Sequence, residues 1–159
     1  MEAARNAVHD DLEAIVELVA ELRAELAPMR GGAVWSLREA RATADAATFA
    51  ALIETPDAHV VVGTIEGVVV GVGVATTEPL HDGGRLGVLD ELYVTAGARE
   101  IGVGEEVLNA LVAWCTEQGC IGVDALALPG HRATKNFFEE SGFTARALVM
   151  HHRLGHETP

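Results

Sequence analysis

Aromatic residues, basic residues, cysteines and long apolar runs are all scarce in this chain of 159 residues. Aromatic residues make up only 4% of the sequence and hydrophobic residues 49%, so we expect a core of valine, leucine, isoleucine and alanine. No apolar run is long enough to cross a bilayer, so no membrane partner is expected. The length favours a single domain over residues 1–159.

Cysteine usage and charge narrow the class of protein further. Cys115 and Cys120 lack the Cys-x-x-Cys spacing of a redox or metal motif, so we expect reduced core thiols in a cytoplasmic protein. The first 15 residues also lack the basic-then-apolar layout of a signal peptide. The 24 acidic residues exceed the 11 basic ones, for a net charge of −13. Such a surface repels nucleic acid and attracts cations, although acidity also serves solubility.

Helical and strand patterns alternate along the chain without an internal repeat. Apolar spacing predicts helices over residues 9–26, 37–53, 102–118 and 131–141. Strand patterns cover residues 58–65, 66–77, 85–94, 121–128 and 143–154. Asp10 with Glu13, and Ser36 with Glu39, suit capped starts of the first two helices. With a further strand before the first helix, the order βααβββαβαβ predicts an α/β or α+β fold with a mixed sheet.

A loop with two glycines, "AREIGVGEE" over residues 98–106, follows the strand "LDELYV" and precedes an amphipathic helix. A P-loop needs Gly-Lys-Ser/Thr after its second glycine, and Glu105 and Glu106 stand there instead. A dinucleotide-binding fingerprint needs a third glycine where Val107 stands. The loop therefore fits neither of these two classes.

Arg99-x-x-Gly102-x-Gly104 resembles the signature of the GNAT superfamily of acyl-CoA-dependent N-acetyltransferases. The segment "HRATKNFFEESGF", residues 131–143, resembles the fourth helix of that family with its terminal Gly-Phe, and the element order matches over nearly the whole chain. The resemblance implies a GNAT fold, a central mixed and mostly antiparallel sheet flanked by about four helices. It also implies acetyl-CoA as co-substrate and no metal.

In such a loop, backbone N–H groups at the helix N-terminus hold the CoA pyrophosphate, and glycines let the backbone approach closely. Glu105 and Glu106 then lie in the first helical turn, where acids favour the helix dipole. By position, the backbone of Leu92 and Val94 pairs with the pantetheine arm. The resemblance implies cofactor contacts at Leu92, Tyr93, Val94, Arg99, Glu100, Ile101, Gly102, Val103, Gly104, Glu105, His131 and Phe138.

Three positions depart from the family pattern. Glu100 stands where the family often has glycine, and three acids near a pyrophosphate should weaken its binding. His131 stands where the family often has an asparagine that bonds the pantetheine. Phe138 stands where the family commonly has a tyrosine placed to protonate the leaving thiolate. Phenylalanine cannot donate a proton, so either water serves or the thiolate leaves without an acid.

Asp90 and Glu91 are the candidate catalytic residues, because the attacking amine has to lose a proton. Strand alternation predicts Asp90 on one face with Leu92 and Val94, and Glu91 on the other face with Tyr93. The segment "LDELYV" resembles "LEDFFV" of the spermidine/spermine acetyltransferases, in which two acids meet a polyamine. We favour Glu91 as the base.

The first two helices border the acceptor cleft in this family. Four glutamates recur every four residues along the first helix: Glu13, Glu17, Glu21 and Glu25. They form either a solvated outer face or an acidic rim for a cationic acceptor. Trp35, expected in the loop between the two helices, is the aromatic residue nearest to such a rim.

The sequence therefore predicts an N-acetyltransferase that moves an acetyl group from acetyl-CoA to the primary amine of a small, cationic acceptor. Two alternatives stay open: acetylation of a protein N-terminus or lysine, and a catalytically silent acyl-CoA-binding module. A homodimer stays open as the assembly. Adjacent strand residues point to opposite faces, so no metal site is expected at the C-terminal histidines His151, His152 and His156.

Overall fold

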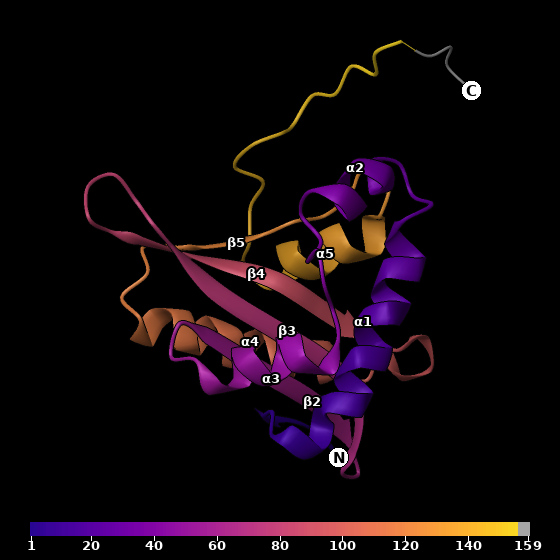
Figure 1. The fold of residues 1–159 in the computed structure, drawn as a ribbon, viewed down its shortest axis with the longest axis vertical. Helices are drawn as coiled ribbons and strands as arrows, with labels where there is room; N and C mark the ends of the chain where they lie inside the picture. Colours follow the sequence, from indigo (N-terminus) through magenta and orange to yellow (C-terminus); the bar gives the residue numbers. More distant parts are fainter. Residues whose placement is uncertain (156–159) are drawn as a thin grey trace.

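The computed structural model describes residues 1–155, which form one sheet with helices on both faces (Figure 1). The strands are β1 (Glu2–Asn6), β2 (Ala58–Ile65), β3 (Val68–Pro79), β4 (Arg85–Val94) and β5 (Val123–Ala125). The α-helices are α1 (Leu12–Leu26), α2 (Gly32–Leu37), α3 (Ala46–Glu54), α4 (Val103–Glu117) and α5 (Arg132–Glu140). Two short 3-10 turns, His9–Asp11 and Ala96–Ala98, lie before α1 and before α4. Within residues 1–155, no helix combines the length and apolar character needed to span a bilayer.

The strands lie side by side in the order in which they occur in the sequence. Neighbours from β1 to β4 are antiparallel, whereas β5 at the edge runs parallel to β4. The predicted mixed and mostly antiparallel sheet is therefore confirmed. The helices α1 and α3 pack on one face and α4 packs on the other, so the sheet separates two apolar cores (Figure 1).

Glycines in the sheet let α4 lie close to the strands. A Cβ atom at Gly73 of β3 would lie 2.5 Å from Val107 Cγ1 and 2.7 Å from Leu111 Cδ1, both on α4. A Cβ atom at Gly87 of β4 would lie 2.6 Å from Cys115 Sγ. No side chain larger than hydrogen fits these gaps without displacing α4. Gly63 of β2 gives the same close approach to Val103 at the start of α4, so the packing holds the N-terminus of α4 against the sheet.

The predicted helix over residues 37–53 is wrong. The chain forms α2 and α3 instead, separated by an irregular segment over residues 38–45. Ser36 does not cap a helix, because its hydroxyl donates to the Gly32 carbonyl within α2 at 2.7 Å. The cap of α3 is Asp45, whose carboxylate accepts from the Thr48 N–H at 2.9 Å. The break places Trp35 in α2 rather than in a loop.

The start of α1 also differs from the prediction. Asp11, rather than Asp10, accepts hydrogen bonds at this point. Its carboxylate accepts from the Val8 N–H at 2.8 Å and from the Arg5 guanidinium at 2.7 and 2.9 Å. These bonds join the end of β1 to the start of α1.

The C-terminal part differs most from the prediction. The strand expected over residues 121–128 is limited to the three residues of β5. The strand expected over residues 143–154 is wrong, because this segment joins no sheet within residues 1–155. Phe143 packs on Phe138 and Arg146 pairs with Asp124 of β5, and the chain that follows leaves the body of the molecule (Figure 1). Leu148, Val149 and Met150 are 85%, 82% and 88% exposed. An apolar pattern favours a strand, but it does not supply a neighbouring strand to pair with.

Candidate active site

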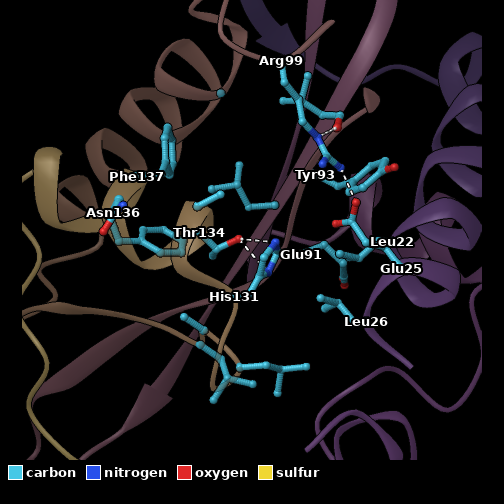
Figure 2. Close-up of a pocket in the computed structure, with 18 of the residues that line it drawn as sticks. Leu22, Glu25, Leu26, Glu91, Tyr93, Arg99, His131, Thr134, Asn136 and Phe137 are labelled. Carbon is cyan, nitrogen blue, oxygen red and sulfur yellow. Dashed lines mark hydrogen bonds and ion pairs between the residues drawn. The ribbon is translucent and has the colours of Figure 1, made fainter. Parts of the chain in front are cut away.

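A cleft opens in the sheet where β4 and β5 part. The two strands pair only from Gly87 to Leu89 of β4, and the cleft beyond them has a volume of about 620 Å³. Residues of α1, α2 and β4 line one side, and residues of α5 and of the chain after β5 line the other (Figure 2). The loop before α4 contributes the rest of the lining. A cleft of this size suits a small-molecule ligand.

The backbone of β4 is open toward this cleft. Thr95 donates its N–H to the Val70 carbonyl at 2.9 Å, so its backbone faces β3. Backbone groups alternate between the two neighbours along a strand. The N–H and C=O groups of Leu92 and Val94 therefore face away from β3, where β5 no longer pairs with β4. An unpaired strand edge is a ready partner for an extended ligand.

A β-bulge lies at Asp90. Val74 of β3 lies opposite Glu91, and the next residue, Ala75, lies opposite Leu89, so Asp90 has no partner residue on β3. The extra residue reverses the alternation of β4 from this point on. Before the bulge, Gly87 directs its N–H toward the chain that leads into β5. After the bulge, even-numbered residues face that side.

Both candidate acids bind one guanidinium group. Arg41 donates from Nε to both carboxylate oxygens of Glu91, at 2.5 and 3.1 Å, and from Nη2 to Asp90 at 3.0 Å. The Thr76 hydroxyl donates to the same oxygen of Asp90 at 2.8 Å. The prediction that Asp90 and Glu91 point to opposite faces is therefore wrong, because the bulge brings both to Arg41. Sequence patterns miss Arg41, which lies on the irregular segment between α2 and α3.

Glu91 lies deep in the wall of the cleft and is only 6% exposed. Burial raises the pKa of Glu91 from its ordinary 4.5 to about 7. The charge and hydrogen bonds of Arg41 oppose this shift, the Asp90 charge adds to it, and the more distant Arg23 lowers the pKa slightly. A carboxyl group that titrates near neutral pH is suited to accepting a proton.

The loop before α4 contains two residues in the left-handed region, Gly102 with φ of 97° and Glu100 with φ of 66°. Gly102 is the N-cap of α4, and its carbonyl accepts from the Glu106 N–H. The N–H groups of residues 103–105 precede this bond and are the free donors of the helix N-terminus. Glu100 adopts a conformation that glycine reaches without strain, which is a physical reason for the glycine common in the resembled family.

Most predicted cofactor contacts line the cleft, and Ile101 and Val103 do not. The Val103 side chain is buried in the core beneath α4, whereas Ile101 is half-exposed. Gly104 faces α5, because a Cβ atom there would lie 3.3 Å from Phe137 Cε1. Glu105 is exposed at the edge of the cleft. At positions 101 and 103, only backbone groups remain as candidate contacts.

Arg99 joins the loop to β4 and α1. Its Nε donates to the Val94 carbonyl at 2.9 Å, and its Nη2 donates to Glu25 at 2.8 Å. Its guanidinium also lies 5.2 Å from the centre of the Tyr93 ring (Figure 2). Arg99 thus covers one of the backbone groups that face the cleft.

The four glutamates of α1 divide between the two interpretations left open by the sequence. Glu13 and Glu17 are solvent-exposed and form part of the outer face. Glu21 accepts from the hydroxyls of Tyr93 and Thr95, at 3.3 and 2.8 Å. Glu25 lines the cleft. Only the last turns of the helix therefore contribute acids to the site.

The side of the cleft formed by α5 carries an imidazole and an aromatic cluster. His131 is the N-cap of α5, and its Nδ1 lies 2.9 Å from the Thr134 hydroxyl (Figure 2). Phe138 is 8% exposed, and its ring packs between Phe137 and Phe143 at centroid distances of 5.5 and 5.2 Å. Phe138 therefore borders the cleft as a packing residue without a polar group.

Among residues 1–155, no group of three or more His, Cys, Asp or Glu side chains is arranged to hold a metal ion. His151 and His152 are exposed in the irregular C-terminal segment, and His156 lies outside the described residues.

Comparison with known proteins shows the family and the fold. Residues 19–143 match the model of the acetyltransferase (GNAT) family, and a search of curated proteins finds no match. The fold resembles AAC(6')-Iy in complex with the bisubstrate analogue CoA-S-monomethyl-acetylneamine, with a TM-score of 0.73, 18% identity, and 96% of this chain and 97% of that chain covered.

Two further structures share the fold. The glucosamine-6-phosphate N-acetyltransferase from Arabidopsis thaliana has a TM-score of 0.71 and 19% identity over 98% of this chain and 99% of that one. A tetramutant of the BH1408 protein from Bacillus halodurans has a TM-score of 0.78 and 17% identity over 95% of this chain and 99% of that one. At such identities the likeness shows a common fold.

The raised pKa of Glu91 predicts a pH-dependent stability. The unfolded chain releases this proton near pH 4.5, whereas the folded protein holds it up to about pH 7. As pH rises through that window, the unfolded chain is ionised while the folded protein still holds the proton. The free energy of unfolding therefore falls progressively, by on the order of 3 kcal/mol. Glu91→Gln removes the titration. The difference in unfolding free energy between variant and wild type, measured with denaturant, should change within the window and stay constant outside it. A difference independent of pH would contradict the raised pKa.

Proposed function

The chain belongs to the acetyltransferase (GNAT) family, as its loop motif predicted, and we propose that it acetylates the primary amine of a small, cationic acceptor. Acetyl-CoA is the co-substrate of this family. The observation that carries the proposal is the parting of β4 and β5, which leaves Leu92 and Val94 without a partner strand beside a cleft, although Arg99 occupies the Val94 carbonyl. We also propose a cytoplasmic location, based on cysteine usage.

The proposed position of acetyl-CoA follows from backbone donors and acceptors. The extended pantetheine arm lies along β4 and pairs with Leu92 and Val94. The pyrophosphate lies at the N-terminus of α4, against the N–H groups of residues 103–105. Arg99 adds a positive charge when it exchanges its bond to Glu25 for a phosphate oxygen. His131 reaches the pantetheine from α5.

The acceptor is proposed to enter beside α1 and α2, where three acids and an indole line the cleft: Glu25, Asp90, Glu91 and Trp35. The net charge of −13 raises the local concentration of cations. The analogue bound to AAC(6')-Iy joins CoA to an acetylneamine, and the relative from Arabidopsis thaliana acetylates glucosamine 6-phosphate. Both names support a small molecule over a protein as acceptor.

Glu91 is the proposed base. The amine nitrogen bonds to the carbonyl carbon of the thioester, the C–S bond breaks, and its electron pair leaves with sulfur. The proton lost by the amine passes to Glu91, directly or through water. The thiolate takes its proton from water, because Phe138 carries no donor group. Backbone N–H groups on the open edge of β4 stabilise the carbonyl oxygen as it gains charge.

We also propose that the chain forms a homodimer through its C-terminal segment, residues 147–154. This segment carries three consecutive apolar residues that are more than four-fifths exposed, and it pairs with no strand in residues 1–155. The outer edge of β5 lacks a neighbour in the same part of the chain. Each copy thus offers both a free strand segment and a free sheet edge, and a symmetric exchange satisfies both.

Kinetics test the role of Glu91. Glu91→Gln keeps the shape of the side chain and removes its charge, so kcat/KM for a cationic amine should fall by roughly 10²-fold or more. Asp90→Asn should cost less, because the amide still accepts from Arg41 and Thr76. Steady-state rates of CoA release across a panel of amines and peptides, with acetyl-CoA affinity as control, decide this. Equal losses would move the role to Asp90, and no release with any acceptor would favour a silent binding module.

The assembly prediction uses two valines. Val149→Asp places a charge in the proposed interface and should convert a dimer to a monomer in sedimentation experiments. Val68→Asp is the matched control, because Val68 is also exposed but lies at the turn between β2 and β3. A wild-type protein that stays monomeric at all concentrations, or equal effects of the two changes, would contradict the proposal.

A further inference from the structure

Arg41 contacts Glu91 but does not line the cleft. The cleft lining includes Asp90 and Glu91 but not Arg41. Together with the two acids, Arg41 borders a separate cavity of only about 10 Å³. Such a space holds about one water molecule. Arg41 therefore touches the candidate base without lining the cleft.

The backbone of Arg41 is held as well as its side chain. Its carbonyl accepts a hydrogen bond from the guanidinium of Arg23 on α1. Its side chain is only 21% exposed and makes three hydrogen bonds to the acids of β4. The backbone and the guanidinium group of Arg41 are thus both held in one position, although the surrounding segment is irregular.

We propose that Arg41 is a positioning residue that keeps the Glu91 carboxylate ionised and turned toward the cleft, and thereby sets the pH above which the acceptor amine loses its proton. This inference rests on the proposed role of Glu91 as the base. It adds a residue that acts through Glu91 and never contacts the reacting atoms.

The physical reason is the cost of a buried charge. A carboxylate that is 6% exposed has lost most of its hydration, which favours the protonated and catalytically inactive form. The Nε group of Arg41 returns part of that stabilisation, because it donates to both oxygens of the ionised group. One N–H group serves both oxygens, so the carboxylate keeps further lone pairs that can accept a proton.

The charged groups around Glu91 act in opposite directions. Arg41 from the irregular segment and Arg23 from α1 lower the pKa of Glu91, whereas Asp90 on β4 raises it. Helix α2 contributes Trp35, which does not titrate, and His131 lines the far side of the same cleft. Removal of Arg41 should therefore raise the pKa of Glu91 and removal of the Asp90 charge should lower it. A general loosening of the fold would not produce shifts of opposite sign.

The test follows the ionisation of Glu91 directly by NMR titration of its side-chain carboxyl carbon in the ligand-free protein. The signal is identified by its absence in Glu91→Gln. Wild type should titrate near pH 7, and Arg41→Gln should titrate about one unit higher or more. Arg41→Lys keeps a charge, so Glu91 should titrate between its values in wild type and in Arg41→Gln. In Asp90→Asn, Glu91 should titrate at a lower pH than in wild type.

Arg38→Gln is the matched control, because Arg38 lies near Arg41 but is exposed and pairs with Glu39. It should leave the titration unchanged. A Glu91 titration in Arg41→Gln that coincides with wild type would overturn the proposal. If Arg41→Gln does not fold, Arg41→Lys and Asp90→Asn decide, and a failure of either to shift the titration overturns it.

The acid limb of the pH profile of kcat/KM provides the second readout. It should move with the NMR titration in each variant. If the titration moves and the rate profile does not, Glu91 is not the base and the proposed mechanism fails, although Arg41 still controls its ionisation. If neither moves, the link between Arg41 and Glu91 is itself wrong.

Discussion

The early end of the pairing between β4 and β5 is the constraint on which the rest of the site depends. Three residues of parallel pairing hold the strands together, and beyond Leu89 the edge of β4 has no neighbour in residues 1–155. A sheet normally hides backbone donors and acceptors from ligands. Here the parting exposes them beside a helix N-terminus that glycines in the sheet hold in place. One break in a regular sheet thus yields both a cleft and the polar groups that line it.

The bulge at Asp90 places the two candidate acids beside this open edge of β4. It turns the backbone of Leu92 and Val94 toward the cleft and brings the two acids to one arginine. The acids therefore differ in role although they are adjacent. Asp90 lies nearer the surface with two hydrogen-bonding partners, whereas Glu91 lies buried with a pKa near neutral. Two neighbouring carboxylates in different environments can take different roles in acid–base chemistry.

Local patterns in the sequence were enough for the loop, α4 and β4, because glycine spacing and apolar periodicity act over a few residues. They predicted the strand, the glycine-containing loop and the helix in this order, and the motif in the loop pointed to the family. They failed where the outcome depends on distant contacts. Arg41 meets Glu91 only after the predicted second helix breaks, and the bulge depends on how β3 pairs with β4. The apolar residues near Val149 predicted a strand for which residues 1–155 provide no neighbour.

The central claim is that the open edge of β4 pairs with acetyl-CoA. Amide hydrogen exchange at single residues, with and without saturating acetyl-CoA, tests it most directly. The account predicts that exchange slows strongly at Leu92 and Val94. Tyr93 is the internal control, because its backbone faces β3, and its exchange should change little. Unchanged exchange at Leu92 and Val94, in a protein shown by calorimetry to be saturated with acetyl-CoA, would contradict the account.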